Sequence, residues 1–421
     1  MSILIKGAGL NGEKKDIYIE GNIIKEIGAH LEIHADEVIA AEGKVAIPSF
    51  INGHTHAAMS LLRGYADDMP LKEWLETKIW PVEAHMTEED VYWGAKLACL
   101  EMIKTGTTFF SDMYWHWRGT ALAVQEMGIR AAVSAVLIDL FDEKKTKEQI
   151  ELNEQLFASR SDFGPRVIFT LGPHAVYTVS GKALQWCADF AREKGLLVHI
   201  HLSETEEEVR ACLHDHGVRP VRYLESLGFL GPHVVGCHCV WLDDEDMEIL
   251  QSNNVRVVHN PISNMKLAVG GVFPYAKLKE RGVIISLGTD GCASNNNLDM
   301  LETAKFASLL QKFHTNSPVV MPAHEALEMI TSQGARAFNL DCGAIEAEKW
   351  ADIALVDLSH PQLTPHFHLE SDLIYSANGS CIDTLICDGK VLMRERRVEG
   401  EEEIVAKARE VAFDLVRRTS G

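Results

Sequence analysis

The sequence lacks any run of about 20 consecutive apolar residues, the length that a membrane-spanning helix needs. Its first residues, MSILIKGAGLNGEKK, contain no long apolar stretch after a basic segment, so they do not resemble a secretory signal. We therefore expect a cytoplasmic protein that has no membrane as a partner.

Positive charge is scarce, with 40 Lys and Arg residues against 61 Asp and Glu residues and a formal net charge of -21. Nucleic acids and anionic membrane surfaces repel such a chain, which excludes both as main partners. A small neutral or cationic molecule is the expected partner. The composition is also compatible with a homo-oligomer.

Paired cysteines are also missing, because the nine cysteines are odd in number and scattered from Cys99 to Cys387. They suit a reducing compartment better than a disulfide framework, and we expect most of them to be small buried fillers. The chain has no internal repeats, linkers or low-complexity tracts.

Short alternating strands are predicted at both ends of the chain. ILIKGAGLNGEKKDIYIEGNIIKEIG and DEVIAAEGKVAIPSFING alternate apolar residues with turn residues, and the pattern returns in ADIALVDLSHP and TLICDGKVLMRERRVEG. We expect residues 1–49 and 346–421 to pair into one small β-sandwich domain, which includes the C-terminal helix EEEIVAKAREVAFDLVRRT.

The segment 50–345 alternates apolar strands with amphipathic helices. Its strand-like runs are TTFFSDM, IRAAVSAVLI, VIFTLGPH, LLVHIHLSE, VVGCHCV, VRVVHNP and VIISLGTDG. This rhythm is typical of βα units with a parallel sheet, most economically a closed (β/α)8 TIM-like barrel. With 421 residues, of which 46% are hydrophobic, the chain can hold such an α/β barrel and a smaller domain.

His54 and His56 follow an apolar strand, and because side chains alternate along a strand, both point to the same face. They can share one metal ion. Among 19 histidines such a triplet arises readily by chance, and three other pairs have the same spacing: His199/His201, His214/His216 and His366/His368. Spacing alone does not choose among them.

Position along the chain does choose, because catalytic residues of a parallel barrel gather at the C-terminal ends of its strands. The residues that close an apolar run are His54, His56, His174, His201, His238 and Asp290. The pair His214/His216 lies on a polar helix, and His366/His368 lies within LTPHFH, so we interpret both as solvated or structural.

Other interpretations exist for single residues. A strand-end histidine is often a buried, hydrogen-bonded core residue, and Asp290 before Gly291 is also a common turn residue. Five histidines together with an aspartate favour a metal site. His199 lies deeper on the strand and is predicted to be a core histidine, and Cys237-His238-Cys239 lacks the second cysteine pair of a structural zinc site.

Six segments carry a family resemblance: the run from PSFINGHTHAAMS through PLKEWLETKIWPVEAHM, then LGPHAVYT, HLSET, CHCVWLD, HNPISNMKLA and LGTDGCASNNNLDM. Together they resemble the methylthioadenosine / S-adenosylhomocysteine deaminase family of the amidohydrolase superfamily, which includes 5'-deoxyadenosine deaminases. The resemblance covers nearly the whole chain. It implies an (α/β) barrel, one divalent metal ion, and hydrolysis of an adenine amino group to the inosine analogue plus ammonia.

The resemblance implies that the metal ligands are His54, His56, His201 and Asp290. The fourth strand ends in LGPH without a lysine, which is similar to the mononuclear branch. We expect Zn2+, with Fe2+ or Mn2+ as alternatives. Three histidines and a carboxylate leave a position for water, whose pKa a bound divalent ion lowers to about 7.

We assign the removal of the water proton to Asp290 and His238, and protonation of the purine ring nitrogen to Glu204. The alternative for His238 is a core histidine, or one that only supports the metal ligands from behind. The alternative for Glu204 is an acidic first helical turn, an interpretation that Glu206, Glu207 and Glu208 in SETEEEVR fit directly.

The resemblance further implies that Glu83 binds the ribose hydroxyls, that His174 binds the purine and that Trp74 walls the pocket. The alternatives are a helix-end charge for Glu83, a capped turn for His174 and ordinary core packing for Trp74.

The sequence departs from the family at SAVLID, where Ala135 and Val136 replace an arginine. Because bidentate arginine is the usual partner of a carboxylate, we expect neutral nucleosides such as 5'-deoxyadenosine, methylthioadenosine or adenosine to be preferred over S-adenosylhomocysteine. Arg118, Arg130 or Lys144 to Lys147 are the alternative cations.

Two alternative functions remain. A guanine-type or triazine-type amidohydrolase would use the same metal site with a different pocket. A non-catalytic barrel scaffold would require the loss of a ligand or proton carrier, and all those positions are filled.

Overall fold

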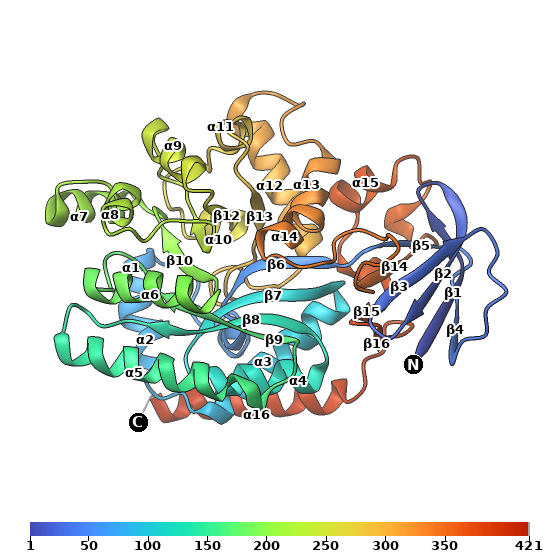
Figure 1. Cartoon of the computed structure of the whole chain (residues 1–421), viewed down its shortest axis with the longest axis horizontal. Coiled ribbons are helices and arrows are strands. Elements are labelled where there is room, and N and C mark those ends of the chain that lie inside the picture. Colours follow the sequence, from blue (N-terminus) through green and yellow to red (C-terminus); the bar gives the residue numbers. More distant parts are fainter. Residues whose placement is uncertain (420–421) are drawn as a thin grey trace.

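Two β-sheets organise the chain in the computed structural model, which describes residues 1–419 (Figure 1). One of them is the predicted barrel, and all its paired strands are parallel. Its strands follow chain order: β6 (Phe50–Thr55), β7 (Thr107–Tyr114), β8 (Arg130–Leu137), β9 (Val167–Pro173), β10 (Val198–Leu202), β11 (Val234–His238), β12 (Arg256–His259) and β13 (Ile285–Leu287).

The first and last barrel strands meet through hydrogen bonds beyond the end of β13. The Asp290 amide donates to the His54 carbonyl (2.9 Å). The Asn52 side chain donates to Thr289 Oγ1 (2.7 Å) and accepts from the Thr289 amide (3.0 Å). This closure brings Asp290 next to His54, although the two residues lie far apart in the sequence.

Helices cover the outside of the barrel. They are α3 (Glu88–Lys104), α4 (Trp117–Met127), α5 (Glu143–Ser159), α6 (Gly181–Lys194), α7 (Glu206–His216), α8 (Pro220–Ser226), α9 (Asp244–Ser252), α10 (Pro261–Lys266), α11 (Tyr275–Glu280), α12 (Met300–Thr315), α13 (Ala323–Met329) and α14 (Ser332–Ala337). The α3 helix starts at a capping box, in which Thr87 and Asp90 satisfy each other's backbone amides. Between β6 and α3, a short helical segment forms α1 (Leu71–Trp74), a π turn (Leu75–Ile79) and α2 (Trp80–Glu83).

The second sheet joins both ends of the chain, as predicted. It runs β16-β15-β14-β5-β1-β2-β3, with β4 beside β1, and β14 pairs antiparallel with β5. By its hydrogen bonds the expected β-sandwich is one mixed sheet, and residues from both ends, such as Ile5 and Ile353, share its apolar core. The strands are β1 (Ser2–Leu10), β2 (Glu13–Glu20), β3 (Ile23–Gly28), β4 (Glu37–Ala40), β5 (Lys44–Pro48), β14 (Ile353–Asp357), β15 (Ile382–Cys387) and β16 (Lys390–Met393).

The C-terminal helix α16 (Glu401–Thr419) packs on the barrel and not on the second sheet, which corrects the grouping predicted from chain order. Figure 1 shows it running beneath the barrel, away from the blue N-terminal strands. Its Leu415 lies in one apolar cluster with Val91 of α3, and Arg418 donates to both carboxylate oxygens of Asp90 (2.7 and 2.8 Å). The short α15 (Leu369–Ser371) precedes β15. The domain limits 1–49, 50–345 and 346–421 stay a prediction.

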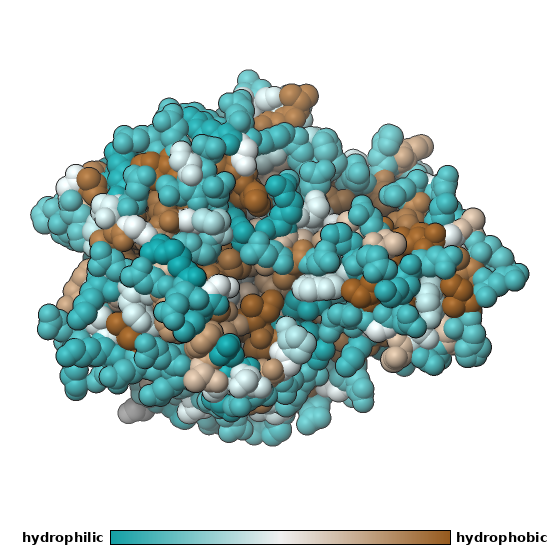
Figure 2. Space-filling view, in the orientation of Figure 1, coloured by the Kyte–Doolittle hydropathy of each residue, from teal (hydrophilic) through white to brown (hydrophobic). Residues whose placement is uncertain are grey.

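The face drawn in Figure 2 is mostly hydrophilic, and its apolar patches are small and separate. Within residues 1–419, no helix combines the length and the apolar character that crossing a membrane requires. All nine cysteines are buried and free, in line with their expected role as small fillers.

Candidate metal centre and active-site cleft

His54 and His56 lie at the C-terminal end of β6, with Thr55 between them facing the other way. Thr55 Oγ1 donates to the Asp112 carboxylate (3.1 Å), as does the Ala57 amide (2.7 Å). The buried carboxylate of Asp112 therefore anchors the strand end, and both imidazoles point toward the barrel axis as strand alternation predicts.

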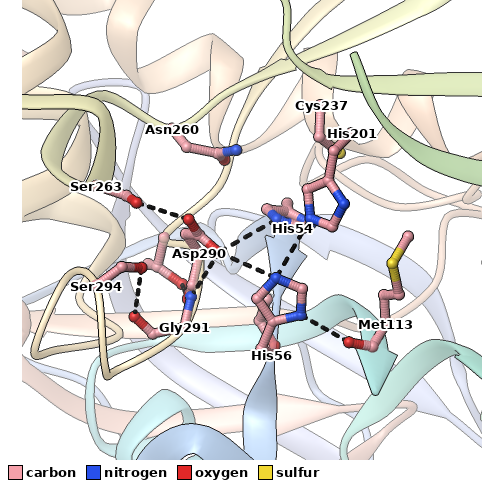
Figure 3. A network of polar contacts seen from close by, with 12 residues as sticks. His54, His56, Met113, His201, Cys237, Asn260, Ser263, Asp290, Gly291 and Ser294 are labelled. Carbon is pink, nitrogen blue, oxygen red and sulfur yellow. Dashed lines mark hydrogen bonds and ion pairs between the residues drawn. The ribbon is translucent and has the colours of Figure 1, made fainter. Parts of the chain in front are cut away.

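The four predicted ligands converge in Figure 3. Asp290 Oδ1 lies 3.3 Å from His54 Nε2 and 3.2 Å from His56 Nε2. His201 Nε2 lies 3.3 Å from His56 Nε2. Tetrahedral ligands placed at about 2.0–2.1 Å from one zinc ion would be about 3.3–3.4 Å apart, so these spacings fit a single ion.

The hydrogen bonds on the far side of the rings show which nitrogens are free. His56 Nδ1 donates to the Met113 carbonyl (2.6 Å), and His201 Nδ1 donates to the His174 carbonyl (2.8 Å). Because a carbonyl only accepts, Nδ1 carries the proton in both rings, so in their neutral, metal-binding form the lone pairs lie on the two Nε2 atoms, which face each other. His54 Nε2 is buried without a hydrogen-bond partner. A cation satisfies all three nitrogens, so the residues present fit a divalent metal ion.

The pKa shifts of these four residues also favour a bound cation. Burial lowers the pKa of His54 and, with neighbouring imidazoles, holds the pKa of His201 well below its usual range. Burial would also lower the pKa of His56, but Asp290 raises it to about 9. Burial would raise the pKa of Asp290, but His54 and His56 hold it far lower. An ionised carboxylate beside imidazoles favours a positive charge between them.

Residues behind the ligands orient them. His54 Nδ1 and His199 Nε2 share a hydrogen bond of 2.7 Å, and Ser263 Oγ donates to Asp290 Oδ2 (2.6 Å). His199 is buried, as predicted for a core histidine, and Cys237 Sγ lies 2.9 Å from its Nε2. Cys237 therefore contacts the rear of this site instead of forming the separate zinc site considered for Cys237-His238-Cys239.

Glu204 and His238 lie beside the ligands, at the ends of β10 and β11. Glu204 Oε1 is 3.5 Å from His238 Nδ1, which also accepts a hydrogen bond from the Asn264 amide group (2.9 Å). Burial lowers the pKa of His238 to about 3 and raises the pKa of Glu204 well above its usual range. The pKa values of both groups are thus displaced toward their neutral forms, an arrangement suited to proton transfer.

The other predicted residues line one cleft, whose lining also includes His56, His201 and Asp290. Glu83 accepts from the Trp115 indole (3.2 Å), and burial raises the pKa of its carboxyl group. His174 Nδ1 lies 2.8 Å from Thr178 Oγ1. Trp74 also lines the cleft, while its indole donates to the Ala66 carbonyl (2.9 Å), so it both packs and walls the cavity.

Sequence reasoning missed several residues of this site. Tyr114, Trp115 and Trp80 line the cleft, and Ser263 and Asn264 of α10 hold Asp290 and His238. The signal for the last two was the polar run HNPISN directly after a barrel strand. That run indicates the family resemblance, but nothing in it shows which residues Ser263 and Asn264 face.

The position of the missing arginine is apolar. Val136 lines the cleft and, with Ala135, an adjoining side pocket. Arg130 lies at the opposite end of β8 and pairs with Asp388 (3.1 Å), which rules it out as a substitute. Arg118 lines the side pocket and pairs with Asp162 (3.5 Å).

The three lysines of this region, Lys144, Lys145 and Lys147, are less suitable than Arg118. Lys144 is 85% exposed and pairs with Glu148 within α5 (3.6 Å). Neither it nor Lys145 or Lys147 is among the residues that line the two cavities. Arg118 is thus the cation among residues 1–419 that lines the side pocket.

Comparison with known proteins gives consistent matches over the whole chain. The amidohydrolase family model matches residues 45–392. The chain is 47% identical to a 5'-deoxyadenosine deaminase of Methanoregula boonei, over 99% of this chain and 96% of that protein. It is 48% identical to a 5-methylthioadenosine/S-adenosylhomocysteine deaminase of Thermococcus sibiricus, over 93% of this chain and 94% of that one.

Solved structures share the fold. The crystal structure of an adenosine deaminase from Xanthomonas campestris with bound zinc superimposes with a TM-score of 0.92 at 30% identity, covering 99% of this chain and 98% of that one. The zinc complex of an atrazine chlorohydrolase from Arthrobacter aurescens has a TM-score of 0.89 at 22% identity, covering 97% of this chain and 100% of that one, and shows the fold alone.

Proposed function

This chain belongs to the amidohydrolase family, and from that premise we propose that it hydrolyses the amino group of an adenine nucleoside, giving the inosine analogue and ammonia. The observation that carries the proposal is the convergence of His54, His56, His201 and Asp290 at the floor of a cleft that also holds Glu204 and His238. Relatives that are 47% and 48% identical over nearly their full length are named as deaminases of such nucleosides, which supports the substrate class.

His54, His56, His201 and Asp290 are the residues that would hold the metal, for which we propose Zn2+ because their nitrogen and carboxylate donors suit it and a zinc-bound relative shares the fold. When bound, such an ion lowers the pKa of a water molecule to about 7 and so provides hydroxide at neutral pH. Fe2+ and Mn2+ are the alternatives that metal analysis of the purified protein distinguishes.

The buried residues beside the ligands move the protons. Burial raises the pKa of Glu204 and so favours its protonated form, which donates to the purine ring nitrogen next to the amino-bearing carbon and makes that carbon electrophilic. His238 and Asp290 accept the proton of the attacking water. The carbon–nitrogen bond to the amino group then breaks as its nitrogen takes the proton that His238 and Asp290 removed from the water and leaves as ammonia. The remaining hydroxyl proton passes to Glu204, which leaves the carbonyl of the inosine analogue and restores the acid.

Residues of the cleft wall bind the rest of the nucleoside. Glu83, held by the Trp115 indole, accepts hydrogen bonds from the ribose hydroxyls. His174 lies with its ring centre 4.8 Å from that of His201 and contacts the purine. Trp74 covers the apolar wall. We propose these three roles from position in the cleft together with the family resemblance.

The apolar surface at Ala135 and Val136 favours nucleosides with an uncharged 5' group. S-adenosylhomocysteine carries a carboxylate, and Arg118, already paired with Asp162, is the cation that could receive it. We therefore propose 5'-deoxyadenosine, methylthioadenosine and adenosine as better substrates than S-adenosylhomocysteine. The free, buried cysteines suit the reducing cytoplasm, where we propose that the enzyme works.

A panel of adenine nucleosides that differ only at the 5' position tests this proposal. The change in absorbance on conversion to the inosine analogue gives kcat/KM for each. We expect S-adenosylhomocysteine to be about 10- to 100-fold poorer than the neutral nucleosides, the equivalent of one missing charged hydrogen bond. Arg118→Ala, as a control, should not change turnover of the neutral substrates. Turnover of guanine or a chlorotriazine without turnover of any adenine nucleoside would contradict the proposal.

A further inference from the structure

The three glutamates in the first turn of α7 look equivalent in the sequence but differ in the structure. Glu206 pairs with Arg210 (2.6 Å), and Glu207, which is 73% exposed, lies 3.8 Å from Lys72. Glu208 is only 4% exposed and forms no ion pair with any residue from 1 to 419. A buried carboxylate without a cation is costly, so its hydrogen bonds must explain its place.

Glu208 binds two consecutive backbone amides of the turn between β10 and α7. Its Oε1 accepts from the Ser203 amide (2.8 Å), and its Oε2 accepts from the Glu204 amide (2.8 Å). Ser203 has a left-handed backbone (φ 49°), and its carbonyl accepts from the amides of Val240 (3.0 Å) and Trp241 (2.9 Å). The turn is thus held from both sides, by α7 and by the segment after β11.

Capping of α7 does not account for these bonds. Thr205 is the N-cap, and its hydroxyl already accepts from the Glu208 amide (3.1 Å). In a capping box the third helical residue would return to the amide of the N-cap itself. Glu208 instead accepts from the amides of Ser203 and Glu204, which precede the N-cap and belong to the turn between β10 and α7.

We propose that Glu208 is a positioning residue, which holds the Glu204 peptide so that the Glu204 carboxyl faces His238 and the cleft. The observed result is the 3.5 Å separation between Glu204 Oε1 and His238 Nδ1. Burial raises the pKa of Glu208 itself to about 7, and its ionised form contributes, after burial and Asp290, to raising the pKa of Glu204. The inference rests on the proposed role of Glu204 in proton transfer.

The first test is Glu208→Gln in the zinc-loaded enzyme. The amide oxygen can accept from one backbone amide, while the amide nitrogen faces the other donor, so the turn must shift. A shift of about 1 Å in a catalytic group can cost about 100-fold, and we expect kcat to fall about 10- to 100-fold with a smaller change in KM and unchanged zinc content. Glu207→Gln, the same change on the exposed side of the helix, should leave kcat unaltered. Wild-type kcat in Glu208→Gln would overturn the proposal.

Two further variants distinguish a positioning role of Glu208 from a general loss of protein stability. Thr205→Ala removes the N-cap but leaves the Glu208 carboxylate, so it should lower the melting temperature and keep kcat near the wild-type value. An equal loss of kcat in Thr205→Ala would overturn the proposal. Glu208→Asp is compatible with a first helical turn and keeps the charge, but it shortens the side chain by one methylene group. It should therefore also lower kcat, which keeps the proposal testable even if Glu208→Gln does not fold.

A double-mutant cycle tests whether Glu208 acts through Glu204. In the Glu204→Gln background, Glu208→Gln should cause little further loss of the residual turnover, because the group that it positions is already absent. Fully additive losses would contradict the inference. Metal content is measured for every variant.

Amide hydrogen exchange gives a reading that does not depend on activity. Exchange at Ser203 and Glu204 should be faster in Glu208→Gln and unchanged in Glu207→Gln. Absence of adenine nucleoside turnover by the wild type would contradict the proposed function alone, because the kinetic variants are then compared on whichever substrate is turned over and the exchange reading still applies.

Discussion

Glu204 occupies a buried place that favours the protonated form of its carboxyl group. It is 8% exposed, and burial, Asp290 and Glu208 all raise its pKa. The same burial keeps the neighbouring His238 neutral. Two groups with displaced pKa values therefore stand side by side as an acid and a base, as proton transfer at neutral pH requires.

Replacing that acid should separate chemistry from metal binding. We expect Glu204→Gln to retain full zinc content and to lose about 10²- to 10⁴-fold in kcat, because it removes a proton donor but no ligand. Turnover and metal content are measured on the same preparation. Glu206→Gln, on the exposed first turn of α7, is the control. Near-normal turnover by Glu204→Gln would refute the role proposed for Glu204.

His201→Ala should instead lower metal occupancy. Its Nε2 is a free lone pair at the centre of the site, so its loss leaves three of the four proposed ligands. Metal analysis after dialysis at a fixed free zinc concentration measures the effect. His214→Ala removes an imidazole that is 87% exposed on α7 and should bind zinc like the wild type. Stoichiometric zinc in His201→Ala would contradict the ligand assignment.

Among the elements, α16 ties the end of the chain to the barrel. One of its faces is buried on α3, where Leu415 is fully buried, while Phe413 on another face is 67% exposed. The amphipathic pattern predicts the helix, but an apolar stripe does not specify which surface receives it.

Truncation of these two side chains should have unequal effects on stability. We expect Leu415→Ala to lower the free energy of unfolding by about 2–5 kcal/mol through lost burial and a cavity, and Phe413→Ala to change it by less than about 0.5 kcal/mol. Urea unfolding followed by circular dichroism measures both. Equal effects would show that α16 does not pack on α3 in solution.

At the scale of the whole molecule, an ion network joins the base of the barrel to the second sheet. Asp388, in the turn after β15, accepts from Arg130 of β8 (3.1 Å) and from Arg166 before β9 (3.2 Å). Burial would raise the pKa of Asp388, but the charge and hydrogen bonds of Arg130, with further hydrogen bonds from Asn22 and Arg166, lower it. Asp388 thus stabilises the folded state in its ionised form.

The effect of removing that charge should depend on pH. A carboxyl group whose pKa is lower in the folded state stabilises the protein above its unfolded pKa of about 3.9, and the stabilisation is lost as the pH falls through the lower folded value. Asp388→Asn should therefore cost about 1.5–3 kcal/mol at pH 7 and progressively less below about pH 4. Melting temperatures across pH 3–7 measure the difference. A gap that stays constant down to pH 3 would argue against this role.

The sequence by itself determined the features that depend on local order along the chain. Alternation along β6 places His54 and His56 on one face, and the position of each polar residue at a strand end indicates the catalytic end of a parallel barrel. Strand patterns at both termini likewise predicted one shared sheet, which the pairing of β14 with β5 confirms. These features follow from periodicity, which a sequence records directly.

Only the tertiary structure decided which residues meet. Closure of the barrel brings Asp290 to His54. The tertiary structure also places Arg130 away from the cleft, while Arg118 lines its side pocket. On α7 it buries Glu208 and leaves its neighbour Glu207 exposed. Such contacts join residues distant in the chain or distinguish neighbours of identical chemistry. They depend on how each element is rotated and packed, which neither composition nor spacing encodes.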